Sequence, residues 1–361
     1  MNPLRALHEH GQSVWLDFLA RRFVIEGQLK ELVRRDALAG VTSNPTIFEK
    51  AIGETADYDG AMQEMVRRGD KDAKALYEAL AVEDIQKAAD VLRPVYDETQ
   101  RRDGYVSLEV SPYLARDTEG TIAEARRLWK AVGRDNLMIK VPATREGLPA
   151  IRQLLGEGVN VNITLLFSQK VYEQVADAYL AGLEQWVAQG GDAARIASVA
   201  SFFVSRIDSA IDKQVGEDLR GKVAIANAKL AYRRYQRIFS GARWEKLRGK
   251  GASTQRLLWA STGTKNPDYS DVLYVETLIA PDTVNTMPPA TMDAFRDHGK
   301  VRPTLEENLN EAEWVLAELE RAGVSLDQTT DRLVDDGVRL FAEAADKLLS
   351  AIDRKRTAFG K

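Results

Sequence analysis

The sequence contains no cysteine and only three histidines among its 361 residues. Without cysteine, disulfide bonds, thiolate catalysis and cysteine-ligated zinc or iron–sulfur sites are excluded. His8 and His10 lie close to the N-terminus, and the third histidine is His298. This distribution argues against a histidine-based catalytic triad and against a metal site built from several histidines.

The chain also lacks a strong net charge and a long apolar run. Its formal net charge is −4, so we expect no electrostatic attraction to nucleic acid or to an anionic membrane surface. It has no apolar stretch of about 18 residues and no signal-peptide core, which predicts a cytoplasmic protein. A hydrophobic content of 44 % with 29 % charged residues is typical of a globular enzyme with a sizeable core.

Short apolar runs separated by helical patterns extend along most of the chain, and this alternation predicts parallel βαβ units. Eight such units most simply close into a (β/α)₈ TIM barrel of the α/β class. A doubly wound sheet is the alternative, but no glycine-rich G-x-G-x-x-G or Walker A motif is present. The expected strands cover residues 14–18, 41–44, 105–110, 136–142, 158–165, 196–201, 257–261 and 272–279.

Additional helices are expected around this barrel. Residues 47 to about 97 form a long helical region, since apolar residues recur in it at helical spacing. We expect a single domain over residues 1–361, in which residues 290–361 are a C-terminal helical extension packed on the barrel. Gly323 is the expected break between two helices of that extension.

The most informative stretch is residues 136–142, a short apolar run with Lys140 near its end. An unpaired ammonium is costly to bury, so a lysine at such a position either reaches solvent or becomes a neutral amine. A neutral amine in a lined cavity is the nucleophile that Schiff-base chemistry on a carbonyl substrate needs. The alternative is a lysine whose ammonium simply reaches solvent. The residues on the other expected strands are needed to distinguish it from a nucleophilic amine.

Polar residues alternate with apolar ones on several of the expected strands. Because successive side chains point to opposite faces, the apolar set packs on the helices and the polar set faces the barrel axis. A satisfied structural network is one explanation. A shared function is favoured, since each unpaired buried polar atom costs about 1–3 kcal/mol. The inward polar residues are Asp17, Asn44, Glu109, Lys140, Asn162, Thr164 and Ser201.

The chemical types of these side chains indicate catalysis on a sugar substrate. Asp17 and Glu109 supply carboxylates for proton transfer beside Lys140. The amide and hydroxyl side chains suit hydrogen bonds to sugar hydroxyls, and Thr164 is placed to hold a catalytic water. The alternative is an Mg²⁺ site, but such a site generally has its carboxylates together.

Two basic residues follow neighbouring strands. Arg206 comes just after the sixth expected strand and Lys265 just after the seventh. Both would lie at the C-terminal rim, where barrel enzymes commonly hold phosphate. A lone basic residue in a loop is usually just solvated, whereas two on adjacent strands favour a phosphate site.

Five motifs, in order on successive strands, resemble the transaldolase family over residues 14 to about 280. Any one of them alone would be weak evidence, but their common order is specific. The resemblance continues through residues 201–206 and through Ala260-Ser261. The motifs are Val14-Trp15-Leu16-Asp17, Thr42-Ser43-Asn44-Pro45, Ser107-Leu108-Glu109-Val110, residues 139–144 and residues 160–168.

The resemblance implies a class I, metal-free barrel without a cofactor. Such an enzyme moves a dihydroxyacetone unit from sedoheptulose 7-phosphate or fructose 6-phosphate to glyceraldehyde 3-phosphate or erythrose 4-phosphate. This is a reaction of the non-oxidative pentose phosphate pathway. Lys140 matches the family's Schiff-base lysine, and Asp17 matches the group that takes the C4 hydroxyl proton. Glu109 matches the carboxylate that acts through a water held with Thr164.

The resemblance also implies the substrate-binding residues. Arg206 matches one phosphate ligand, but the family's second phosphate arginine has no counterpart here, and Lys265 is the candidate replacement. The expected partners are sugar phosphates, with no nucleic acid, membrane or metal, and the expected state is a monomer or homodimer. The other expected substrate-binding residues are Thr42, Asn44, Asn162, Ser201 and Ser261, of which Asn44, Asn162 and Ser201 match the residues that hold the dihydroxyacetone hydroxyls.

Two other functions stay open on the sequence. One is a lyase on the same barrel, of the fructose-6-phosphate or deoxyribose-phosphate aldolase type, which needs no acceptor. The other is a non-catalytic barrel that binds sugar phosphates. The presence of Lys140, Asp17 and Glu109 together favours the transferase.

Overall fold

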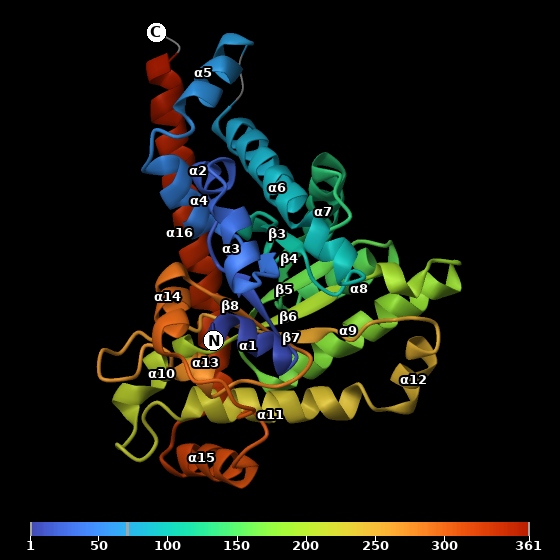
Figure 1. The fold of residues 1–361 in the computed structure, drawn as a ribbon, viewed down its shortest axis with the longest axis vertical. Helices are drawn as coiled ribbons and strands as arrows, with labels where there is room; N and C mark the ends of the chain where they lie inside the picture. The colour runs from blue at the N-terminus through green and yellow to red at the C-terminus, as the bar shows by residue number, and fades with distance from the viewer. Residues whose placement is uncertain (1, 70–71, 360–361) are drawn as a thin grey trace.

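The computed structural model describes residues 2–69 and 72–359, and its centre is a closed barrel of eight parallel strands (Figure 1). The strands follow one another around the barrel in sequence order, and β8 pairs with β1 over five residues to close it. The expected TIM barrel with additional helices is therefore confirmed. The strands are β1 (Gln12–Leu16), β2 (Gly40–Val41), β3 (Tyr105–Glu109), β4 (Leu137–Pro142), β5 (Val161–Leu166), β6 (Ser198–Phe203), β7 (Arg256–Ala260) and β8 (Thr283–Met287).

The position of the eighth strand differs from the sequence prediction. Residues 272–279 contain the short helix α13 (Leu273–Glu276) and a buried turn, while the strand lies further on at Thr283–Met287. The apolar run was misleading because a short buried run fits a strand and a helix equally well. The true strand, Thr-Val-Asn-Thr-Met, has three polar residues among its five and ends just before Pro288.

Helices surround the barrel, as βαβ connections require. The expected helical region over residues 47–97 consists of several separate helices. Residues 1, 70–71 and 360–361, which the expected helices or domain include, lie outside the described residues. Up to β7 the helices are α1 (Pro3–Glu9), α2 (Arg21–Ile25), α3 (Gln28–Asp36), α4 (Pro45–Phe48), α5 (Asp59–Arg67), α6 (Ala73–Glu98), α7 (Thr118–Val132), α8 (Gly147–Gly156), α9 (Gln169–Ala188), α10 (Ser205–Ile211), α11 (Val223–Ile238) and α12 (Ala242–Arg248).

Shorter turns of helix join several of these elements. A π-helical turn, η1 (Glu49–Gly53), continues α4, and Asp72 caps the start of α6 by accepting a hydrogen bond from the Ala75 amide. Such a cap stabilises a new helix start, which is why α6 is separate from α5. The 3₁₀ turns are η2 (Pro112–Leu114), η3 (Ala193–Arg195) and η4 (Asp212–Gln214).

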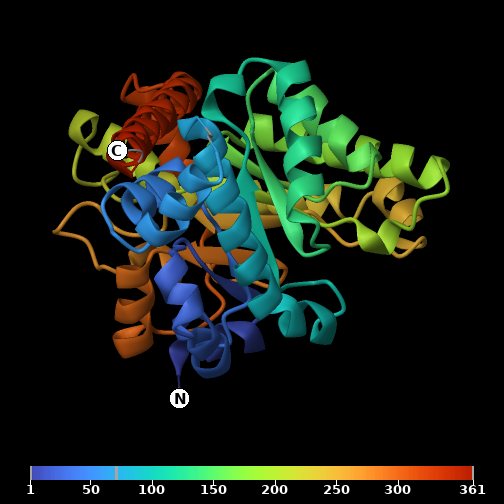
Figure 2. The ribbon, with the colours of Figure 1, turned by 90° about the horizontal axis from the view of Figure 1, so that it is seen from above.

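The C-terminal part adds α14 (Pro289–His298), α15 (Leu309–Arg321) and α16 (Leu326–Phe359). Gly323, with a φ of +78°, separates the last two. α15 packs along α11, whereas α16 runs past α4, α5 and α6 (Figure 1). Viewed from above, α16 lies on the side of the molecule away from α12 (Figure 2).

α16 also reaches the barrel through a close contact at Gly337. A Cβ atom at Gly337 would lie 2.6 Å from Cδ2 of Leu165. Leu165 has a φ of +53° and sits where the β5–β6 register shifts. The missing side chain thus lets the helix approach the irregular end of β5, and this contact brings α16 to the mouth of the barrel.

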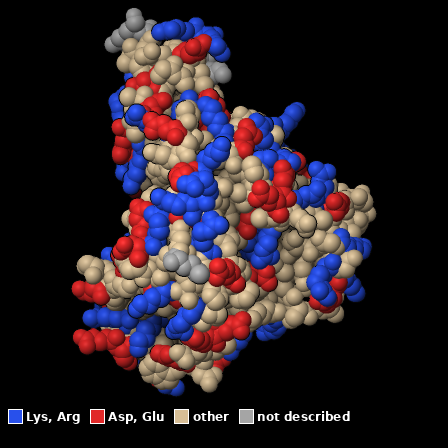
Figure 3. Space-filling view, in the orientation of Figure 1, with Lys and Arg blue, Asp and Glu red and all other residues tan. Residues whose placement is uncertain are grey.

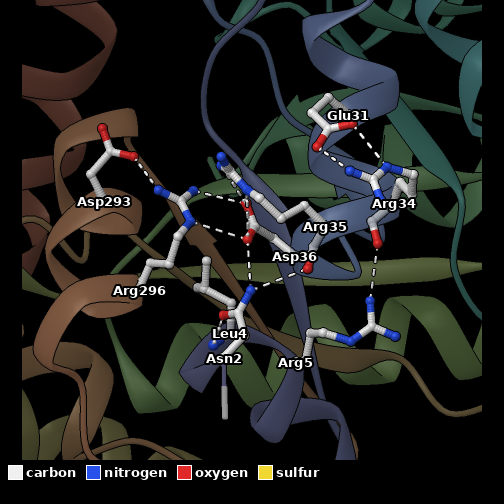
Figure 4. A network of polar contacts seen from close by, with 9 residues as sticks. All are labelled: Asn2, Leu4, Arg5, Glu31, Arg34, Arg35, Asp36, Asp293 and Arg296. Carbon is white, nitrogen blue, oxygen red and sulfur yellow. Dashed lines mark hydrogen bonds and ion pairs between the residues drawn. The ribbon is translucent and has the colours of Figure 1, made fainter.

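A polar network connects α1, α3 and α14 (Figure 4). Its centre is the buried carboxylate of Asp36, which accepts hydrogen bonds from Asn2, Arg35 and Arg296. Asn2 also caps α1, since its side chain accepts a hydrogen bond from the Leu4 amide. The network fastens the helix after β8 to the helices around β1 and supports closure of the barrel.

A buried ion pair lies at the opposite end of the barrel from the mouth. Arg256 donates to Asp103 at 2.9 Å, and each side chain is only 6 % exposed. Asp103 also accepts hydrogen bonds from the Ser13 hydroxyl at 2.7 Å and the Trp15 indole at 3.0 Å. Each charge is compensated by this geometry, so the N-terminal end of the barrel is filled without an unpaired ion.

Charges of both signs are mixed over the face seen in Figure 3, which agrees with the small net charge. Within the described residues, no helix has the length and apolar character needed to span a bilayer.

Replacing Arg256 with Met should lower the free energy of unfolding by about 3–5 kcal/mol, because Asp103 would be left as a buried, unpaired charge. Urea denaturation measures the change. The control is Arg68→Met, which breaks the exposed Arg68–Glu64 pair and should cost at most about 1 kcal/mol. Equal losses in the two variants would contradict the importance of the buried pair.

Candidate active site

A cavity of about 600 Å³ opens at the C-terminal ends of the strands. Side chains from strand ends and from the following loops line it, as in other parallel barrels. Glu109 and Asn162 do not line this cavity directly, and they contact residues that do. The expected site residues in the lining are Asp17, Thr42, Asn44, Lys140, Thr164, Ser201, Arg206, Ser261 and Lys265.

The centre of the site is the pair formed by Lys140 and Glu109. Their residues are partners in the β3–β4 register, and Lys140 Nζ lies 3.3 Å from Glu109 Oε2. Each side chain is 6 % exposed. The amine also donates a 3.0 Å hydrogen bond to the Ser43 carbonyl. Lys140 therefore does not extend to solvent, and its amine has a carboxylate beside it that can accept a proton.

Burial raises the pKa of Glu109, and the nearby Lys140 ammonium opposes that effect. A carboxylate with a raised pKa is a better proton acceptor than an ordinary glutamate. The environment of Glu109 thus suits a group that accepts a proton from Lys140 and returns it.

Asp17 lies just past the end of β1, where its amide donates to the Met287 carbonyl of β8. The Thr42 hydroxyl donates a 2.7 Å hydrogen bond to Asp17 Oδ1. Burial raises the pKa of Asp17, while Lys140 and the Thr42 hydrogen bond lower it. A second carboxylate is thus held at the barrel mouth after β1, which only β2 separates from Glu109's strand β3.

Asn162 and Ser201 form a layer beneath the cavity. The Ser201 hydroxyl donates to Asn162 Oδ1 at 2.6 Å, and the Asn162 amide donates to the Ser107 hydroxyl at 3.0 Å. Asn162 is 0 % exposed. The protein thus uses both ends of the Asn162 amide to orient Ser201 at the cavity wall.

Asn44 has a structural and a site role at once. Its Oδ1 accepts a 3.0 Å hydrogen bond from the Ile47 amide and so caps α4. This bond fixes the side chain and leaves the amide nitrogen for the cavity.

Across the mouth, the Ser261 hydroxyl lies 2.9 Å from the Ser205 hydroxyl. Thr164 is fully buried, and its hydroxyl has no hydrogen-bond partner in the described part of the chain.

Two cations in the lining, Arg206 and Lys265, make no ion pair with any residue in the described ranges. The Arg206 guanidinium instead lies over two rings, 5.2 Å from the centroid of Phe203 and 6.0 Å from that of Phe341. Most other arginines in the protein contact a carboxylate. Unpaired cations beside a cavity are available to an anion such as phosphate.

The helix that begins next to Arg206 is fastened to the loop that carries Lys265. Asp208, on α10, accepts hydrogen bonds from the Ala224 amide and the Tyr274 hydroxyl, both at 2.8 Å. Burial raises its pKa to about 7. Asp212 accepts a 2.8 Å hydrogen bond from Tyr269 of the same loop. These contacts hold the two cation-bearing segments in a fixed relation.

Sequence reasoning missed several residues of the lining, among them Phe341, Phe203 and Thr286. Phe341 comes from α16, far from the barrel strands in sequence, and only the fold brings it to Arg206. Phe203 lies within one of the family-like motifs but received no role. Thr286 was overlooked because its strand was placed too early in the chain. The β-branched residues Thr283, Val284 and Thr286, just before Pro288, are the signal that would have located it.

The fold and this site define a class of protein: parallel-barrel enzymes with a buried lysine whose amine can form a Schiff base with a carbonyl substrate. Residues 14–352 match the sequence model of the transaldolase/fructose-6-phosphate aldolase family. The chain belongs to this family.

Curated relatives match nearly the whole chain. It is 51 % identical to a transaldolase of Saccharopolyspora erythraea over 355 residues, which cover 97 % of this chain and 96 % of the relative. A transaldolase of Thermobifida fusca is 49 % identical over 365 residues, 99 % of each chain. Transaldolase 2 of Nostoc punctiforme is 48 % identical over 373 residues, 98 % of this chain and 97 % of the relative.

Proposed function

We propose that this protein is a transaldolase, which transfers a dihydroxyacetone unit from a ketose phosphate to an aldose phosphate. The family match and the relatives support this activity. The observation that carries the mechanism is the buried amine of Lys140, which lies 3.3 Å from Glu109 and lines a cavity shared with Asp17.

The first step is formation of an imine. Lys140 gives a proton to Glu109, and its free amine attacks C2 of fructose 6-phosphate or sedoheptulose 7-phosphate. The carbinolamine then loses its hydroxyl group as water, with Glu109 returning the proton. Thr164 supplies a free hydroxyl that is suited to hold the water that relays these protons.

The second step breaks the C3–C4 bond. Asp17, as a carboxylate, takes the proton from the C4 hydroxyl, and the C4 oxygen forms the aldehyde that leaves. The bonding electrons move toward the protonated imine, which becomes an enamine. Ser201, Asn44 and Ser261 are suited to hold the hydroxyls of the three-carbon unit that remains.

Transfer requires that the enamine survive until the acceptor arrives. The acceptor aldehyde then forms a new C–C bond at the enamine carbon, its oxygen takes the proton from Asp17, and water hydrolyses the imine. The buried position of the Lys140 amine limits access of water to the enamine. Acceptor binding is therefore the event that completes turnover.

Arg206 and Lys265 are the proposed phosphate ligands. Both line the cavity without a carboxylate partner among the described residues, and Asp208 and Asp212 hold their segments together. Lys265 would replace a second arginine as a point charge rather than a bidentate donor. A cytoplasmic location and a monomeric or homodimeric state stay predictions of the sequence.

Borohydride reduction in the presence of fructose 6-phosphate should leave a covalent adduct on Lys140, because it fixes the imine as a stable amine. Intact mass followed by peptide mapping detects the adduct and its position. Lys140→Arg should give no adduct and no turnover, since a guanidinium does not deprotonate near neutral pH.

The matched control is Lys229→Arg. Lys229 is also largely buried, but its amine donates to the Thr304 and Glu307 carbonyls outside the cavity. This variant should keep the adduct. An adduct on a lysine other than Lys140, or turnover by folded Lys140→Arg, would refute the proposed nucleophile.

Lys265→Met and Arg206→Met should each raise KM for fructose 6-phosphate by about tenfold to a hundredfold, because each removes a charged contact to phosphate. Steady-state kinetics with fructose as a second donor provides the comparison, since fructose carries no phosphate for these residues to bind. Lys213→Met, at an exposed position outside the lining, should change neither KM. An equal effect of Lys265→Met on both donors would remove Lys265 from the phosphate site.

A further inference from the structure

Three residues that follow or end adjacent strands form a chain of hydrogen bonds at the barrel mouth. The hydroxyl oxygens of Thr286 in β8 and Thr42 after β2 are 2.8 Å apart, and Thr42 donates to Asp17 after β1 at 2.7 Å. Thr42 is 2 % exposed and Thr286 is 3 % exposed. Water therefore competes little for these hydroxyl groups.

The direction of this chain follows from counting protons. A threonine hydroxyl carries one proton and accepts through its lone pairs. When Asp17 is a carboxylate it can only accept, so Thr42 uses its single proton on Asp17. Thr286 must then be the donor in the 2.8 Å contact with Thr42. Among the described residues, no other hydrogen bond of the Thr286 hydroxyl competes with this one.

We propose that Thr286 is a positioning residue for the base of the proposed reaction, acting through Thr42 to keep a donated hydrogen bond on Asp17. The proposal rests on the proposed function, in which Asp17 takes the C4 hydroxyl proton. Thr286 does not need to touch the reacting atoms. A hydroxyl that accepts one hydrogen bond is a stronger donor of the next, so the chain stabilises the ionised form of Asp17.

Burial and nearby charged groups also set the pKa of Asp17, and the effect of this hydrogen bond adds to theirs. Lys140, Arg206 and Lys265 favour the carboxylate, Glu109 opposes it, and burial raises the pKa of Asp17. The cations come from three other strands or loops and remain when Thr286 is changed. Loss of the Thr286 hydroxyl removes the hydrogen bond that Thr42 accepts, so Thr42 becomes a weaker donor to Asp17 and the pKa of Asp17 should rise.

The test compares two threonines on the same strand. Thr286→Val removes the hydroxyl with little change in shape, and Thr286→Ser restores it. Thr283→Val is the control, because Thr283 is also buried and hydrogen-bonded, to Ala280 and Gln12, but at the far end of β8 from Asp17. Circular dichroism and thermal unfolding establish that each variant is folded.

With fructose 6-phosphate and erythrose 4-phosphate, Thr286→Val should lower kcat by about tenfold. The acidic limb of its pH profile for kcat/KM should move up by about half to one pH unit, since that limb reports ionisation of the base in the free enzyme. Thr286→Ser should return both to near the original values, and Thr283→Val should leave the limb in place.

An unchanged acidic limb in folded Thr286→Val, or the same shift in Thr283→Val, would overturn the proposal. Borohydride trapping separates this outcome from failure of the proposed function. If the unmodified protein forms the Lys140 adduct while Thr286→Val keeps the original limb, only the role of Thr286 is wrong. If no adduct forms on Lys140, the reaction itself is wrong.

Discussion

The site depends on one buried ion pair, that between Lys140 and Glu109. A lysine amine at the centre of a barrel is unfavourable unless its charge is compensated, and Glu109 is the partner that the β3–β4 register places at 3.3 Å. The same proximity gives the amine a proton acceptor. Glu109 therefore has two effects. It compensates the charge of the buried lysine, and it can activate the amine by accepting its proton.

The remaining residues of the mouth arrange charge around this pair. Asp17 provides a second carboxylate, held by Thr42, and Arg206 and Lys265 provide cations without carboxylate partners in the described structure. The opposite end of the barrel is filled by the Arg256–Asp103 pair, in which the charges compensate each other. The charges at the closed end thus compensate each other within the protein, whereas Arg206 and Lys265 at the mouth have no carboxylate partner among the described residues.

Much of the fold and of the site could be predicted from the sequence, because alternation along short strands determines which side chains face the axis. That rule is sufficient to identify Lys140, Glu109 and Asp17 as inward-facing residues. It failed at β8, where residues 272–279 form a buried helix and turn, because a short apolar run does not distinguish the two kinds of element. Thr286 was missed as a direct consequence.

Other features could not be predicted because they depend on packing between distant segments. Phe341 reaches Arg206 only because α16 passes the barrel mouth, and that passage depends on the close contact between Gly337 and Leu165. Asn162 is a further example. Its inward position follows from the alternation, but only the fold reveals that Ser201 and Ser107 engage both ends of its amide.

The most direct test of the central claim is nuclear magnetic resonance of the covalent intermediate. Protein labelled with nitrogen-15 in its lysines would be mixed with fructose 6-phosphate carrying carbon-13 at C2, without an acceptor. We expect a one-bond coupling between C2 and a lysine nitrogen that is absent in Lys140→Arg, and transfer of the labelled three-carbon unit into a new ketose phosphate only when erythrose 4-phosphate is added. Turnover without a carbon–nitrogen bond, or steady release of labelled dihydroxyacetone without acceptor, would contradict this claim.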